Sequence, residues 1–204
     1  MSEDRFVVKA HEMLSLLSRT RGRAHDVLVG EWVRCWIELD RYHLVFNPAP
    51  AAGSHTADIM FLEPQYDEVE DYEPSTWKPV GVAEIENNKN KWFEKLESLS
   101  EYTKEYQLRF VLLCVRVYQN SRDDMKSFDQ LKEKIISFSR NTPNIKWILY
   151  RMDESQRNKD MYLVTLKPDP EADVYNYRFI CGGEGIIIEN GEVIFRSSHS
   201  IDLK

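Results

Sequence analysis

A near-continuous apolar stretch at residues 109–118, RFVLLCVRVY, constrains the fold of this chain more than any other segment. Strands of this kind are typically buried on both faces of a sheet, because crossover helices cover them. The stretch follows an amphipathic helical pattern at 92–106, whose Trp92 and Tyr102 we expect in the core rather than as base-stacking platforms. A second helical pattern begins after it, with Ser127 as the expected capping residue. The segment therefore predicts an inner strand with helices packed against its sheet.

Shorter apolar runs, separated by turn residues, predict the other elements. They are a helix at 6–22, a helix or helix-to-strand segment at 26–40, a run at 41–48 that ends in the turn signal Asn47-Pro48, and strands at 55–64, 78–86, 144–152 and 161–168. A polar loop at 153–160 separates the last two strands, and a terminal hairpin at 177–197 turns at Asn190-Gly191. This order predicts an α/β sandwich with a mixed central β-sheet flanked by helices and a C-terminal β-hairpin.

The length of 204 residues and the 42% hydrophobic content predict one compact domain over residues 1–204. No stretch approaches the roughly 20 apolar residues that span a bilayer, and the charged N-terminus lacks an apolar signal region. We therefore expect a cytoplasmic protein with no membrane partner. Cys35, Cys114 and Cys181 are odd in number and far apart, which predicts reduced core residues rather than disulfides or a four-ligand zinc site.

The net charge of −7 is unfavourable for a protein that must meet nucleic-acid phosphates. Part of this acidity, however, comes from one short segment, DEVEDYE at residues 67–73. We interpret this segment as a solvated acidic loop rather than an acidic docking tail, and we give it no role in a site.

Acidic side chains interrupt two of the predicted strands. Asp58 lies in TADIM at 56–60, and Glu84 and Glu86 lie in VGVAEIE at 80–86, where they face the same way because strand side chains alternate. Gathering carboxylates on a sheet costs repulsion and desolvation unless a cation or a proton offsets them. Magnesium binds such oxygen ligands and keeps several waters. The pattern indicates a divalent-metal site; the alternative is an edge strand with one solvated face, where the acids pair with lysines.

This arrangement resembles the restriction-endonuclease-like, or PD-(D/E)XK, nuclease superfamily. The resemblance lies in a strand aspartate, 25 intervening residues, and a Glu-X-Glu that ends a strand leading into an amphipathic helix and a hydrophobic strand. It covers about residues 30–150, which would form the core, with a C-terminal strand or hairpin extension at about 160–200. It implies the sandwich fold of that superfamily and hydrolysis of DNA phosphodiester bonds with Mg²⁺ or Mn²⁺.

Carried over to this chain, the resemblance implies that Asp58 and Glu84 hold the metal ion, with the carbonyl of Ile85 as a backbone ligand. Glu86 stands where the family usually has its catalytic lysine, which is a departure from the pattern. At that position a glutamate would help to bind the metal or accept a proton from the attacking water.

Two further roles stay open. The catalytic cation would come from Lys89, or alternatively from Lys91, although both are also ordinary lysines at a helix entry. A glutamate contributed by the first helix would be Glu31 or Glu38. Members of this superfamily often work as homodimers, because two DNA strands need two sites, and we expect the same here.

The sequence therefore predicts a metal-dependent DNA endonuclease. The glutamate at the lysine position and the negative net charge favour an alternative, a catalytically degenerate nuclease-fold module that binds nucleic acid or a protein partner. A third possibility is a structural domain that associates through its terminal hairpin.

Overall fold

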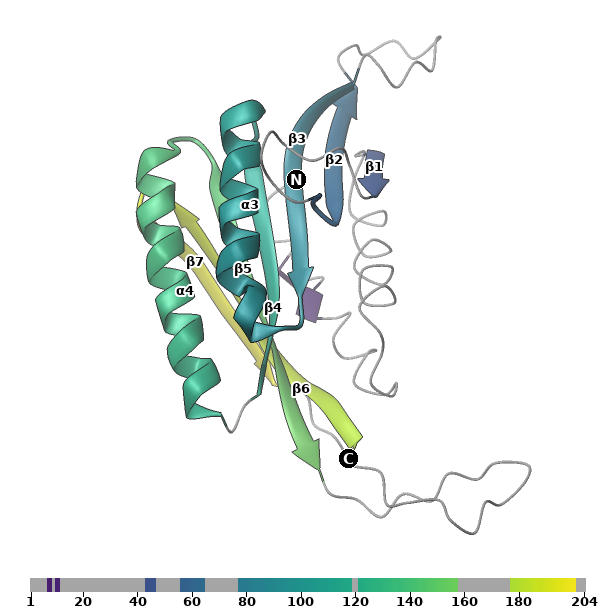
Figure 1. The fold of residues 1–204 in the computed structure, drawn as a ribbon, viewed down its shortest axis with the longest axis vertical. Helices are drawn as coiled ribbons and strands as arrows, with labels where there is room; N and C mark the ends of the chain where they lie inside the picture. Colours follow the sequence, from purple (N-terminus) through teal and green to yellow (C-terminus); the bar gives the residue numbers. More distant parts are fainter. Residues whose placement is uncertain are drawn as a thin grey trace, which may run out of the picture.

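The computed structural model describes residues 7, 8, 10, 11, 43–46, 56–64, 77–118, 121–157 and 177–200 (Figure 1). Over these residues, seven strands form one mixed sheet in the order β1-β2-β3-β4-β5-β6-β7. The strands are β1 (His43–Phe46), β2 (Ile59–Pro64), β3 (Trp77–Glu86), β4 (Phe110–Tyr118), β5 (Lys146–Arg157), β6 (Tyr177–Glu189) and β7 (Glu192–Ser200). The helices are α3 (Trp92–Glu105), α4 (Arg122–Asn141) and the short 3₁₀ helix η2 (Lys89–Lys91). The predicted α/β class, with helices against a mixed sheet, is confirmed.

The centre of the sheet is parallel and its flanks are antiparallel. Strand β4 pairs parallel with β3 and with β5, whereas β1-β2, β2-β3, β5-β6 and β6-β7 are antiparallel. Each parallel pair is joined by one crossover helix, α3 or α4. Right-handed crossovers that progress in the same direction across a sheet place their helices on the same face. Both helices accordingly cover one face, side by side (Figure 1).

The face under the helices carries one of two apolar cores. Trp92, Leu96 and Leu99 of α3 pack there with Val111 and Leu113 of β4, and all five side chains are almost completely buried. The helix stripe recurs every three or four residues because that spacing keeps one side of an α-helix toward the sheet. This face therefore fixes where α3 lies over the end of β3.

The opposite face carries the second core. Val7 and Ala10 of the N-terminal helical segment pack in this core with Cys114 of β4. A Cβ atom on Gly185 of β6 would lie 2.4 Å from Cγ1 of Val7, so the glycine permits the close approach. Strand β4 is thus buried on both faces, as its sequence predicts.

Helix α4 begins earlier than predicted. Its capping residue is Ser121, whose side chain accepts a hydrogen bond from the backbone N–H of Asp124 at 3.1 Å. Ser127, the expected cap, lies inside the helix and donates to the carbonyl of Asp123 at 2.8 Å. A serine inside a helix commonly bonds a preceding carbonyl. The apolar pattern therefore predicts the correct helix but places its first residue too late in the chain.

Strand β5 is longer than predicted, and the expected loop at 153–160 is wrong over residues 153–157. Asp153 pairs with Gly182, and Arg157 pairs with Tyr177, so β6 supplies a partner strand along the polar segment. Pairing of this kind outweighs the low strand preference of polar residues. The strand predicted at 161–168 lies outside the described residues.

The C-terminal hairpin is confirmed. Asn190 and Gly191 have φ values of 52° and 83°, the left-handed pair that a two-residue hairpin turn requires. The N–H of Gly191 donates to Oγ of Ser139 at 2.8 Å, which ties the turn to the end of α4. Among the described helices, none combines the length and the apolar character needed to cross a membrane.

Candidate functional site

Asp58 and Glu84 come together where β2 and β3 meet. The two strands are antiparallel with Ile59 opposite Ala83, so Asp58 stands opposite Glu84 one position further along. Asp58 lies at a bend directly before β2, not inside the strand as predicted. Its Oδ2 accepts a hydrogen bond from the backbone N–H of Ile85 at 2.7 Å. The Asp58 carboxylate thus bonds the backbone of β3 just before β2 begins.

Helix α3 fixes the segment that carries Asp58. The backbone N–H of Ala57 donates to the Tyr102 hydroxyl at 3.1 Å, and both residues are fully buried. Trp92, ten residues earlier on the same helix, is also fully buried. Both aromatic residues therefore belong to the core, as predicted, and Tyr102 also positions the aspartate.

Glu84 is completely buried under α3 and contacts Lys95 from the first turn of that helix. Lys95 donates a hydrogen bond to Oε1 at 3.1 Å, and its Nζ lies 3.0 Å from Oε2. Oε2 nevertheless receives no hydrogen bond of acceptable geometry. A buried carboxylate next to a second one needs a proton or a cation to offset its charge, and Lys95 supplies one cation here.

The protonation of this pair follows from burial. Burial, followed by repulsion from Asp58, raises the pKa of Glu84 to about 9, although Lys95 opposes the shift. For Lys95, burial disfavours the charge, but attraction by Glu84, Asp58 and Glu86 outweighs it and raises the lysine pKa. Burial therefore favours the protonated form of Glu84, whereas the neighbouring carboxylates favour the charged form of Lys95.

Glu86 lies two residues further along β3 and is also buried. Its Oε1 accepts a hydrogen bond from the backbone N–H of Asn88 at 2.6 Å, which closes the turn into η2. In the described part of the chain, no three His, Cys, Asp or Glu side chains stand close enough together to hold a metal ion. The structure thus joins Asp58 to Glu84 and leaves Glu86 beside them, bonded to the turn. We call Asp58, Glu84, Glu86 and Lys95 the carboxylate site.

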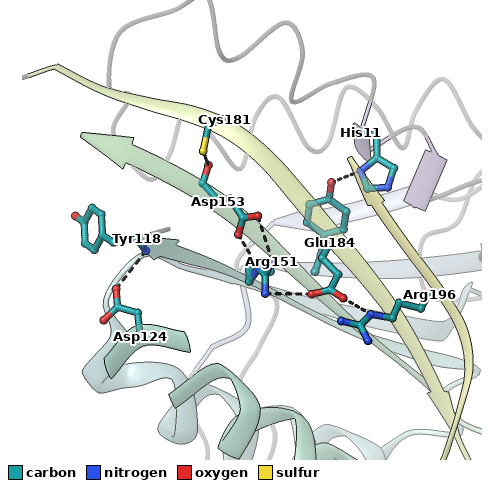
Figure 2. Close-up of polar contacts among 9 residues, drawn as sticks. His11, Tyr118, Asp124, Arg151, Asp153, Cys181, Glu184 and Arg196 are labelled. Carbon is teal, nitrogen blue, oxygen red and sulfur yellow. Dashed lines mark hydrogen bonds and ion pairs between the residues drawn. The ribbon is translucent and has the colours of Figure 1, made fainter. Parts of the chain in front are cut away.

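Lys89 lies elsewhere, although the sequence made it the preferred catalytic cation. Its Nζ pairs with Oδ1 of Asp124 at 2.8 Å, and Oδ2 of Asp124 accepts from the backbone N–H of Tyr118 at 3.2 Å. Figure 2 shows the second of these bonds at the start of α4. Lys89 therefore links η2 to α4, and Lys91 is exposed. The two candidate glutamates, Glu31 and Glu38, lie outside the described residues.

The sequence reasoning missed Lys95. A signal was nevertheless present, since position 95 falls three residues after Trp92 and four before Leu99, inside the apolar stripe of α3. A lysine in such a stripe, just beyond a strand that ends in Glu-X-Glu, is placed to meet those acids.

The donor set fits a hard divalent cation. Asp58 and Glu84 offer carboxylate oxygens, and Oε2 of Glu84 is buried without a hydrogen-bond donor. Glu86 is bonded to the turn instead, but its negative charge also acts on the single ammonium of Lys95. Magnesium needs few protein carboxylates because waters complete its shell.

A second charged network lies on the same face of the sheet. Arg151 of β5 contacts Asp153 at 2.6 Å and Glu184 of β6 at 3.1 Å, and Glu184 also contacts Arg196 of β7 (Figure 2). The pairing register places Arg151 in one row with Glu86, separated by a single strand. The network balances two acids with two arginines across three strands, and no local pattern predicted it.

The raised pKa of Glu84 predicts how stability depends on pH. In metal-free protein, Glu84 stabilises the fold fully below about pH 4.5, its unperturbed pKa, and this contribution is lost as the pH rises toward about 9. Between these values the folded chain keeps a proton that the unfolded chain has released, so the free energy of unfolding falls by up to ~1.4 kcal/mol per pH unit. Glu84→Gln should remove this slope.

Denaturant titrations at several pH values, in the presence of a chelator, measure the effect. The difference between wild type and Glu84→Gln reports the titration of Glu84 together with its coupling to Asp58 and Lys95, because all other titrating groups are common to both. Glu97→Gln is the matched control, since the Glu97 side chain is 63% exposed. Parallel pH profiles for wild type and Glu84→Gln would contradict the assigned shift.

Comparison of the chain with protein-family models, with curated proteins and with solved structures gave no match.

Proposed function

We propose that this protein is a nuclease of restriction-endonuclease-like fold that hydrolyses DNA phosphodiester bonds with Mg²⁺ or Mn²⁺. The observation that carries the proposal is a fully buried Glu84 placed opposite Asp58, with one carboxylate oxygen that lacks a donor. The order of elements around this pair supports it. Asp58 precedes β2, Glu84 lies near the end of β3, and α3 and β4 follow, which is the order that the superfamily resemblance implies.

Each residue of the carboxylate site would have its own role in the reaction. Asp58 and Glu84 would hold the ion, with the backbone carbonyl of Ile85 as the further ligand that the resemblance implies. A divalent ion bound there would lower the pKa of its water ligand and polarise a phosphoryl oxygen. Glu86 would orient the water or accept its proton. Lys95, rather than Lys89, would neutralise the negative charge that develops on the phosphate.

One observation favours the alternative, a degenerate module that binds nucleic acid or a protein partner. Glu84 already has an internal cation, because Lys95 Nζ lies 3.0 Å from its Oε2. If this ion pair replaces the metal permanently, the site has become structural and the domain acts by binding alone.

Cleavage assays separate the two functions. The protein is incubated with supercoiled, linear, single-stranded and branched DNA in Mg²⁺, in Mn²⁺ and in chelator. We expect cleavage of at least one substrate in the presence of metal and none in chelator. Asp58→Asn is the control for contamination, because it keeps an oxygen acceptor for the Ile85 N–H while removing the charge. Equal cleavage by wild type and Asp58→Asn, or none by either, would refute the nuclease assignment.

A further inference from the structure

The Lys95 ammonium already supplies positive charge to the carboxylate site. Its Nζ lies 3.1 Å from Oε1 and 3.0 Å from Oε2 of Glu84, so it contacts both oxygens. Asp58 and Glu86 attract the same ammonium. The Lys95 side chain is only 18% exposed and that of Glu84 is fully buried, so water screens the pair weakly.

A divalent ion bound by Glu84 would have to share this carboxylate with Lys95. Oε2 is the oxygen without a hydrogen-bond donor, and it is also the oxygen nearer to the ammonium. Binding of the ion adds two positive charges beside an ammonium that already contacts both oxygens of Glu84. The net change is positive, so it repels Lys95 in a buried setting where such repulsion is strong.

We propose that Lys95 is an internal counter-ion that competes with the divalent ion for Glu84 and thereby sets the metal affinity of the carboxylate site. This inference rests on the proposed function, because it assigns a role to Lys95 toward the metal of that same site. The free protein then binds the ion weakly. A nearby phosphate strengthens binding, since its negative charge attracts the ammonium away from Glu84.

Calorimetric titration of the full-length protein with Mn²⁺ tests the inference without any measurement of activity. Lys95→Met and Lys95→Gln both remove the charge, and two neutral variants guard against a packing defect in one of them. We expect both to bind Mn²⁺ at least about tenfold more tightly than wild type. Lys95→Arg keeps the charge and should bind like wild type. Lys134→Met is the surface control, since Lys134 pairs with the exposed Glu97 at 2.7 Å.

The outcomes separate this inference from the proposed function. If wild type binds Mn²⁺ and the neutral variants bind no more tightly, the counter-ion role is overturned and the nuclease proposal stands. If only the neutral variants bind, the counter-ion role is supported, and Lys95 has replaced the metal as in the degenerate alternative. If no variant binds Mn²⁺, both ideas are overturned.

Discussion

Under the proposed nuclease function, Lys95→Met is expected to lower the rate constant of metal-dependent DNA cleavage by about 10²–10³-fold, the usual effect of losing a group that stabilises transition-state charge. The reason is that Lys95 is the cation in contact with Glu84, at 3.0 Å from its Oε2. The loss should appear in kcat under saturating metal, because the same substitution is expected to tighten rather than weaken metal binding. Single-turnover cleavage at saturating Mn²⁺ measures it.

Lys89→Met is the matched comparison, because the two lysines lie six positions apart and only one contacts the carboxylates. Lys89 pairs with Asp124 at 2.8 Å, so its loss should leave the cleavage rate close to that of wild type. Lys95→Arg should recover part of the lost rate, since it restores the charge with a different shape. A large loss in Lys89→Met together with full activity in Lys95→Met would show that the catalytic cation is the one predicted from the sequence.

Arg151→Met is expected to lower the free energy of unfolding by ~3–5 kcal/mol, because it removes the buried cation that Asp153 and Glu184 share and leaves only the exposed Arg196 beside Glu184. Arg151 contacts Asp153 at 2.6 Å and Glu184 at 3.1 Å, and the Glu184 side chain is only 3% exposed. Its guanidinium also lies 5.1 Å from the centre of the Phe128 ring, which places it under α4. Chemical denaturation at neutral pH measures the loss.

Arg196→Met provides the control on the same carboxylate. Arg196 also contacts Glu184, but its side chain is 67% exposed, so water can replace much of the lost interaction. We expect this variant to lose no more than about 1 kcal/mol. Arg151→Met combined with Glu184→Leu should recover much of the stability lost in Arg151→Met alone, because the double variant no longer buries the Glu184 charge. Equal losses in Arg151→Met and Arg196→Met would contradict the distinction between buried and exposed partners.

Local hydrophobic spacing and turn residues were enough to predict most of the helices and strands. Residues 109–118 form β4 with an error of one residue, and the helix predicted at 92–106 is α3 (Trp92–Glu105). The Asn190-Gly191 turn was also found, because only a few residue types accept a positive φ at both positions. Where the pattern was ambiguous, at the start of α4 and the end of β5, the boundaries were misplaced by several residues.

Local pattern likewise predicts some residues of the candidate site and misses others. Asp58 and Glu84 could be singled out because acids are unusual in apolar strands, and the structure places them opposite each other. Lys95 was missed, because its contact with Glu84 depends on how α3 lies over β3. The Arg151 network joins residues of three strands and has no trace in local spacing.

The sequence by itself determined the class of fold, the central buried strand, the hairpin turn and the acidic pair, since each depends on the chemistry of neighbouring residues and on a local period of two or 3.6. Only the tertiary structure decided which cation meets the acids, because Lys89 and Lys95 are equally charged in the chain. The direction of α3 across the sheet brings Lys95 to Glu84, and the start of α4 holds Lys89 at Asp124. Such contacts join segments that are distant in the chain, and burial then fixes their strength.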